Sequence, residues 1–161
     1  MNAADLLTTF AQLGVALAGF SGVVVALGAR PTGQWSSREQ QLLTILLGTG
    51  GGVILWSILP LLLLAAELSE RKVWLISSGS WCLAQGAVLV VRARGLARDR
   101  DAQTQERGLV TFAFLGGISA LAIQLANLIW LAVAWPHLAA VAWQLALSFL
   151  VFVRLLRHPP A

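Results

Sequence analysis

The sequence predicts an all-α integral membrane helical bundle with about five transmembrane helices. Hydrophobic residues make up 58% of the 161 positions, and charged residues make up 11%. A soluble domain carries roughly a quarter charged residues. The mean hydropathy is +0.79, and the few charges are clustered between long apolar runs. A chain of this size cannot hide so much apolar surface in one aqueous core, so we expect lipid to surround it.

Five apolar runs are long enough to cross a bilayer, which needs about 20 residues at a rise of about 1.5 Å each. The last two runs meet at Trp135-Pro136-His137. One unbroken helix over both would be about 70 Å long, more than twice the hydrocarbon thickness, so we predict a tight hairpin at this tripeptide. The whole chain, residues 1–161, is predicted to be a single transmembrane domain with spans at about 6–28, 42–66, 73–91, 109–135 and 138–156.

The basic residues predict the orientation of the chain in the membrane. With five spans, nine arginines fall on the side of the C-terminus, and only Arg71 and Lys72 fall on the other side. Because cytoplasmic loops are enriched in basic residues, we expect the N-terminus outside and the C-terminus inside. The preference for arginine over lysine indicates a bacterial source, and hence the inner (plasma) membrane. The nine are Arg30, Arg38, Arg92, Arg94, Arg98, Arg100, Arg107, Arg154 and Arg157.

The first span sorts by helical period into one bulky stripe and two lines of small residues. The bulky stripe, which includes Phe10 and Phe20, is predicted to meet lipid. The run Gly14-x3-Ala18-x3-Gly22 permits another helix to approach closely. Gln12 adds an amide to this span. One small line is Ala4, Ala11, Gly14, Ala18 and Ser21, and the other is Ala16, Gly19, Val23 and Ala26.

Small residues also lead into two amides on the fourth span, at spacings of four, three, four and three. An amide alone in hydrocarbon is unfavourable, so we expect these side chains to face protein or water. Gln85 and Gln144 place further amides on the third and fifth spans. The stripe consists of Ala113, Gly117, Ala120, Gln124 and Asn127.

The second span contains helix-weakening residues. Glycines occupy four of the five positions 48–52, with Gly48 and Gly52 at the two ends, and Pro60 follows further along. A proline within a helix removes one backbone hydrogen bond. We therefore predict a hinge at Pro60 or a broken helix. Tight packing against the glycines is the alternative interpretation.

No reaction chemistry is apparent. The centres of the spans lack Asp, Glu, His and Lys, the residues that form proton relays and metal sites in membranes. His137 and His158 should lie at opposite membrane surfaces, and Cys82 is the only cysteine. We therefore predict no enzymatic activity, no cofactor, no metal and no disulfide. Short basic loops account for the net charge of +4, so no nucleic-acid partner is expected.

The segment Ala18-Gly19-Phe20-Ser21-Gly22-Val23-Val24 is followed by Arg30, Trp35-Ser36 and Leu59-Pro60. This pattern resembles a group of small multi-pass bacterial membrane proteins with an AGFSG-type first span and no assigned activity. The resemblance covers roughly the first third of the chain. It implies a membrane location and implies no reaction.

Three functional hypotheses follow. The leading one is a homo-oligomer whose small and amide-bearing faces pack between subunits and enclose a passive pore or small-solute path. The first alternative is a non-enzymatic accessory or scaffold subunit that docks on another membrane protein. The second is a lipid-binding or lipid-modifying protein that contacts headgroups through Arg92, Arg94, Arg98, Arg100 and Arg107. A pore requires amides on one water-accessible line, whereas a scaffold allows them to pair internally.

Overall fold

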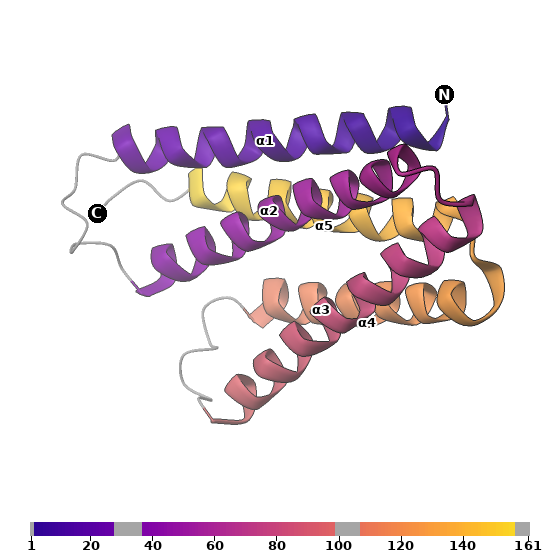
Figure 1. The fold of residues 1–161 in the computed structure, drawn as a ribbon. Coiled ribbons are helices and arrows are strands. Elements are labelled where there is room, and N and C mark those ends of the chain that lie inside the picture. The colour runs from indigo at the N-terminus through magenta and orange to yellow at the C-terminus, as the bar shows by residue number, and fades with distance from the viewer. Residues whose placement is uncertain (1, 28–36, 99–106, 157–161) are drawn as a thin grey trace. The chain divides into compact units, whose positions relative to one another are not determined.

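The computed structural model describes residues 2–27, 37–98 and 107–156, and these ranges contain helices and no strand. Five of the helices are long and apolar enough to cross a membrane. This confirms the all-helical prediction with five candidate spans and is consistent with a multi-pass membrane protein. The elements in chain order are α1 (Ala3–Leu27), α2 (Ser37–Ala65), α3 (Glu70–Arg98), α4 (Arg107–Ala126), the π-helix η1 (Asn127–Leu131) and α5 (Ala134–Leu156) (Figure 1).

The chain divides into two compact units. Unit 1 comprises Met1–Leu61 and Val141–Ala161, and unit 2 comprises Leu62–Ala140. Helices α2 and α5 therefore each contribute residues to both units. That all 161 residues form a single transmembrane domain stays a prediction.

Helix α1 of unit 1 begins at Ala3 because Asn2 caps it. The Asp5 backbone N–H donates to Asn2 Oδ1 at 2.8 Å, and the Asn2 N–H donates to Asp5 Oδ2 at 3.0 Å. This reciprocal pair is a capping box, which satisfies backbone donors that the first helical turn leaves without partners.

The inward face of α1 is made of small residues and one leucine. Leu7, Gly14 and Ser21 are buried at intervals of seven residues. A Cβ added at Gly14 would lie 2.9 Å from Ile54 Cγ1 and 3.3 Å from the Gly50 carbonyl oxygen. Gly14 therefore packs against α2, and the small line that contains Gly14 and Ser21 faces the interior of unit 1.

Helix α2 is continuous from Ser37 to Ala65. The glycines at 48–52 remain helical, so the broken helix that their composition suggested does not occur. Pro60 is fully buried within the same helix. Its proposed role as a hinge stays a prediction.

Unit 2 opens with the turn that ends α2. Glu67 has a φ of 58°, the Leu68 N–H donates to the Leu63 carbonyl oxygen at 3.3 Å, and the Glu67 N–H donates to that of Leu64 at 3.0 Å. These two bonds form a Schellman motif, with a glutamate at the left-handed position that glycine usually occupies. Helix α3 follows and packs against α4 and η1. Helices α3 and α4 run in opposite directions (Figure 1).

The hairpin between the last two spans lies earlier in the chain than predicted. The reversal occurs at Ala132–Val133, and Trp135, Pro136 and His137 belong to the first turn of α5. Ala132 is left-handed, with φ 51° and ψ 48°, and its N–H donates to the Asn127 carbonyl oxygen at 2.8 Å. Proline is tolerated in a first helical turn because N–H groups there have no helical acceptor. Pro136 therefore lies in the first turn of α5 and is not part of the reversal.

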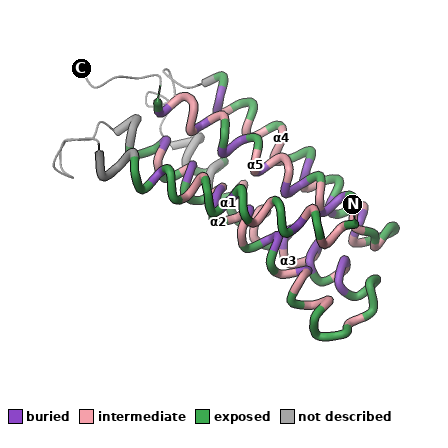
Figure 2. The backbone as a smooth tube through the Cα atoms, turned by 90° about the horizontal axis from the view of Figure 1, so that it is seen from above, coloured by how far each residue is buried: buried purple, intermediate pink, exposed green. Residues whose placement is uncertain are grey.

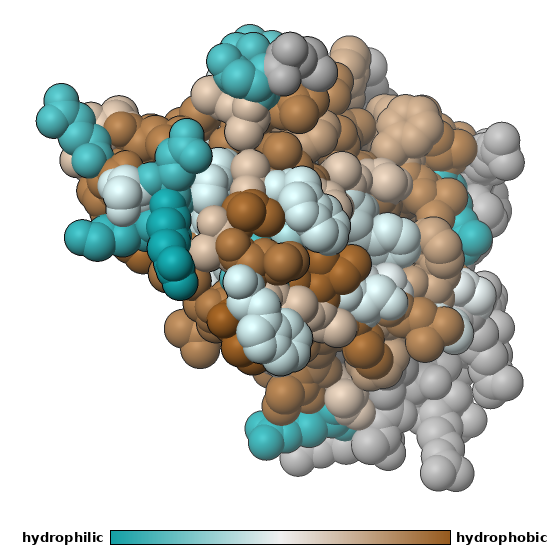
Figure 3. All heavy atoms as spheres, turned by 90° about the vertical axis from the view of Figure 1, so that its right-hand side faces the viewer, coloured by the Kyte–Doolittle hydropathy of each residue, from teal (hydrophilic) through white to brown (hydrophobic). Residues whose placement is uncertain are grey.

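The exposed surface is largely apolar. Buried positions recur along each helix between exposed ones (Figure 2), and hydrophobic residues cover much of the face in Figure 3. Large exposed side chains include Phe20, Leu62, Leu83 and Phe149. Such a surface suits a lipid surrounding.

Adding one methyl group at Gly14 should destabilise unit 1. In Gly14→Ala the new Cβ meets Ile54 and Val53 Cγ1 atoms at 2.9 and 3.1 Å, so packing must shift at a cost of about 1–3 kcal/mol. Gly48→Ala is the matched control, because a Cβ there meets nothing within 4 Å. Thermal unfolding in mild detergent, followed by circular dichroism, should give a lower midpoint for Gly14→Ala only. Equal midpoints would contradict this packing.

Candidate functional site

The predicted amide stripe of α4 leads into a buried polar network in unit 2. Asn127 and Gln124 are both fully buried. Asn127 Nδ2 donates to Ser78 Oγ on α3 at 2.8 Å and to the Val133 carbonyl oxygen at 3.0 Å. Its Oδ1 accepts the Val133 N–H at 3.0 Å. One side chain therefore satisfies both backbone groups of Val133 and also holds α3 against η1.

Gln124 lies one helical turn from Asn127 and contacts α5. Its Nε2 is 3.2 Å from Nδ1 of His137, which is fully buried, and the His137 ring lies 6.2 Å from that of Trp74 between centroids. The sequence analysis places His137 at the membrane surface, and the structure instead buries it. Its place in the first turn of α5 explains the difference, because the chain reverses before it. The Trp-Pro-His sequence was the available signal, since a proline often occupies a first helical turn.

Three polar atoms around this network have no hydrogen-bond partner within the described part of the chain: Ser77 Oγ, Trp81 Nε1 and Gln124 Oε1. All three residues are buried. Buried polar groups in proteins are nearly always paired, so these atoms are candidates for binding a small polar molecule.

A second polar group lies in unit 1. Ser148 Oγ is within hydrogen-bond distance of Thr49 Oγ1, at 2.7 Å, and of the Gln144 carbonyl oxygen, at 2.8 Å. A Cβ at Gly52 would lie 3.2 Å from Gln144 Oε1. Gly52 thus makes room for the Gln144 amide, whose Oε1 has no partner among the described residues.

Of the other residues predicted to pack between helices, some contact a neighbouring helix and others are exposed. Gly117 packs on α3, because its added Cβ would lie 3.3 Å from Leu89 Cδ2, and Ala120 is buried. Ala18 is half-buried. By contrast, Gly22 and Gly48 are exposed, with nothing within 4 Å of an added Cβ.

One face of α1 has no partner within the described residues. It consists of the exposed residues Gln12, Ala16, Gly19 and Val23, and we call it the α1 face. It includes three of the four residues of the second small line. The side chain of the fourth, Ala26, lies outside the described part of the chain. The Gln12 amide makes no hydrogen bond there. Gln85 of α3 is half-buried and is likewise unbonded.

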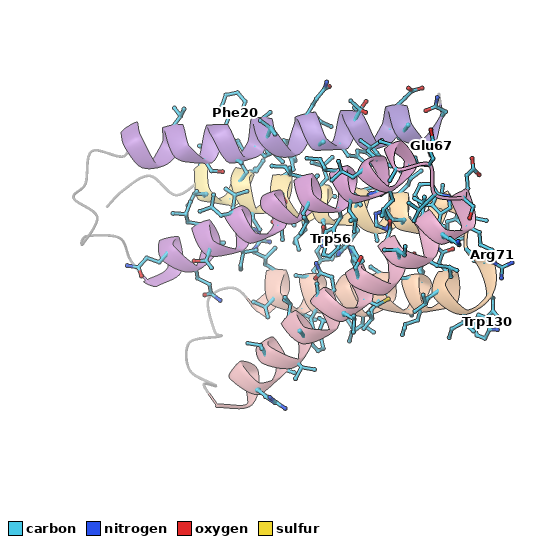
Figure 4. The ribbon with its side chains drawn as sticks, in the orientation of Figure 1. Phe20, Trp56, Glu67, Arg71 and Trp130 are labelled. Atoms are coloured by element: carbon cyan, nitrogen blue, oxygen red, sulfur yellow. The ribbon has the colours of Figure 1, made fainter. Side chains whose placement is uncertain are left out.

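Charged groups gather at the helix ends. Glu67, Arg71 and Trp130 lie at the same end of unit 2 (Figure 4). Glu70 is also exposed, whereas His137 is buried, so these residues do not share one surface. Within the described ranges, no three His, Cys, Asp or Glu side chains are placed to hold a metal.

The predicted headgroup arginines are described only in part. Arg94 near the end of α3 is exposed. The side chains of Arg92, Arg98 and Arg107 and the whole of Arg100 lie outside the described residues. Their contact with lipid stays a prediction.

A scan against protein-family models, a search of curated proteins and a search of solved structures each found no match.

Removing the Asn127 amide should destabilise the hairpin. In Asn127→Leu the Val133 N–H and C=O groups lose their partner. The loss costs about 1–3 kcal/mol for a fully buried group and less for these two, which are part-buried. Ser78→Ala should cost less, because Asn127 keeps both bonds to Val133. Ser119→Ala, at an exposed position of α4, is the control. In chemical unfolding in detergent, the free energy of unfolding should be lower for Asn127→Leu than for Ser78→Ala. That of the control should be close to the wild-type value. Equal stability of the three variants would contradict this role.

Proposed function

We propose that this chain is a non-enzymatic, multi-pass protein of the bacterial inner membrane that acts as a homo-oligomer. The α1 face is the proposed contact between copies. Membrane lipids surround the rest of the assembly. The observation that carries the proposal is the exposed, unbonded amide of Gln12 in the middle of a candidate span.

Gln12 lies near the centre of the apolar segment Ala3–Val23. The hydroxyls of Thr8 and Thr9, on the same helix, donate to the carbonyl oxygens of Ala4 and Asp5, both at 2.9 Å. The Gln12 amide makes no such hydrogen bond within the described residues. Leaving an amide unpaired in hydrocarbon is unfavourable by about 1–3 kcal/mol on mutational scales, so a partner outside the chain would stabilise it.

The rest of the α1 face suits close helix packing. Ala16 and Gly19 lie next to Gln12 at helical spacing, and nothing lies within 4 Å of a Cβ added at Gly19. Small residues let helix backbones approach and bring polar side chains within hydrogen-bond distance. The other small line of α1 is used inside unit 1, which supports a similar use of this one against an outside helix.

A second copy fits this face better than an unrelated helix does. Copies inserted in the same direction and related by a twofold axis along the membrane normal bring equal residues together at equal depth. Gln12 then meets Gln12. An amide both donates and accepts, so the pair is self-complementary.

The described amides give little support to a pore. Gln124 and Asn127 are buried and bonded within unit 2, and Gln144 is buried in unit 1. A water-filled path through one chain would need such groups exposed to water. A small-solute path in this proposal would have to lie between copies.

For orientation, we propose an external N-terminus and a cytoplasmic C-terminus. Arg71 and Lys72 are exposed at the start of α3, and Arg94 is exposed near its end. The arginine excess on the Arg94 side supports a cytoplasmic location for that side. Trp130 and Trp135 are 76% and 57% exposed near the opposite hairpin, as expected for residues of an interfacial belt.

Changes on the α1 face should separate the copies. Gln12→Leu removes an interhelical hydrogen bond of about 0.6–2 kcal/mol, which corresponds to roughly 3- to 30-fold weaker association. Gly19→Leu should weaken association further by keeping the backbones apart. The control is Gly51→Leu, at an exposed glycine of α2 with nothing within 4 Å of its added Cβ. At equal protein and detergent concentrations, the fraction of monomer measured by mass should rise for the α1 variants only. A wild-type monomer, or an oligomer that these variants do not affect, would overturn the proposal.

Labelling of single cysteines should test the orientation. In a Cys82→Ala background, Lys72→Cys and Arg94→Cys place thiols at exposed positions near opposite ends of α3. A membrane-impermeant maleimide should label position 72 in intact spheroplasts and position 94 only after permeabilisation. The reverse pattern would show that the topology is inverted.

A further inference from the structure

We propose that unit 2 binds ordered water between α3 and α4, at Ser77, Trp81 and Gln124. This inference concerns a different unit from the α1 face and does not depend on self-association. It starts from the three buried polar atoms that lack a partner within the described ranges: Ser77 Oγ, Trp81 Nε1 and Gln124 Oε1.

The pairing of α3 with α4 places Trp81 beside Gln124. Asn127 bonds Ser78, and the Cβ position of Gly117 lies against Leu89, so the two helices are antiparallel. Trp81 lies three residues beyond Ser78, and Gln124 lies three residues before Asn127. Each is therefore displaced by about 4.5 Å, in the same direction, from the Ser78–Asn127 bond.

Ser77 lies on the α3 face that is turned towards the start of α5. Trp74, Ser77 and Trp81 follow at spacings of three and four and therefore share one helix face. The Trp74 ring contacts His137, and His137 Nδ1 lies 3.2 Å from Gln124 Nε2. The three unpaired atoms therefore belong to residues on the faces of α3 and α4 that meet near the Gln124–His137 contact.

The chemistry of the three atoms selects the ligand. Gln124 Oε1 accepts, the Trp81 N–H donates, and the Ser77 hydroxyl does both. Water can satisfy such a mixed set, since a buried water makes about three hydrogen bonds. A metal cation would need several oxygen ligands, and an anion would be repelled by the amide oxygen. A neutral, water-sized molecule is therefore the ligand that fits.

Radiolytic hydroxyl labelling read by mass spectrometry tests this site, because radicals formed from bound water modify adjacent side chains. Trp81 and Trp56 are 2% and 7% exposed in the intact chain, so Trp56 is the buried reference. We expect Trp81 to be labelled severalfold faster than Trp56 in the detergent-solubilised wild type. Labelling of Trp81 at or below the rate of Trp56 would overturn the proposal.

Two serine variants complete the test. Ser77→Ala removes one water ligand with a minimal change in volume, so labelling of Trp81 should fall severalfold. Ser80→Ala is the control on the same helix. The Ser80 hydroxyl donates to the backbone carbonyl oxygens of Ile76, at 2.8 Å, and Ser77, at 3.1 Å, and it is not one of the unpaired groups. Equal Trp81 labelling in the two variants would also overturn the site.

Discussion

A chain that reverses between two packed helices leaves backbone N–H and C=O groups beyond the reach of either helix, and leaving such a group unpaired away from water is costly. Asn127 meets this constraint in unit 2 by bonding both backbone groups of Val133. Its remaining amide hydrogen reaches Ser78. This one side chain therefore links the turn before α5 to η1 and to α3.

The placement of Asn127 has consequences one helical turn away. Because the chain reverses at Ala132–Val133, α5 includes Pro136 and His137. His137 is then buried beside Gln124 and does not reach the surface with Glu67 and Glu70. The amides of Asn127 and Gln124 are thus engaged inside unit 2 and are not exposed at its surface.

Small residues serve two different purposes in α1. Gly14 and Ser21 are buried, and Gly14 admits the side chains of α2 at distances that a methyl group would violate. Gly19 belongs to the opposite face, where the space around it is open. The first line is buried in unit 1, and we propose that the second contacts α1 of another copy. In that proposal, a hydrogen bond from Gln12 makes the contact specific, and the small residues make it close.

The sequence by itself determined the number and type of the helices, because apolar runs of about 20 residues have few other solutions. It also identified the stripe of small residues and amides on α4. Only the tertiary structure decided which of the two small lines of α1 is buried, since both have helical period and similar composition. It also decided the position of the hairpin before α5, because Pro136 is compatible both with a chain reversal and with the first turn of a helix. The burial of His137 depends on that position and on a contact with Gln124 thirteen residues away, which helical periodicity does not encode.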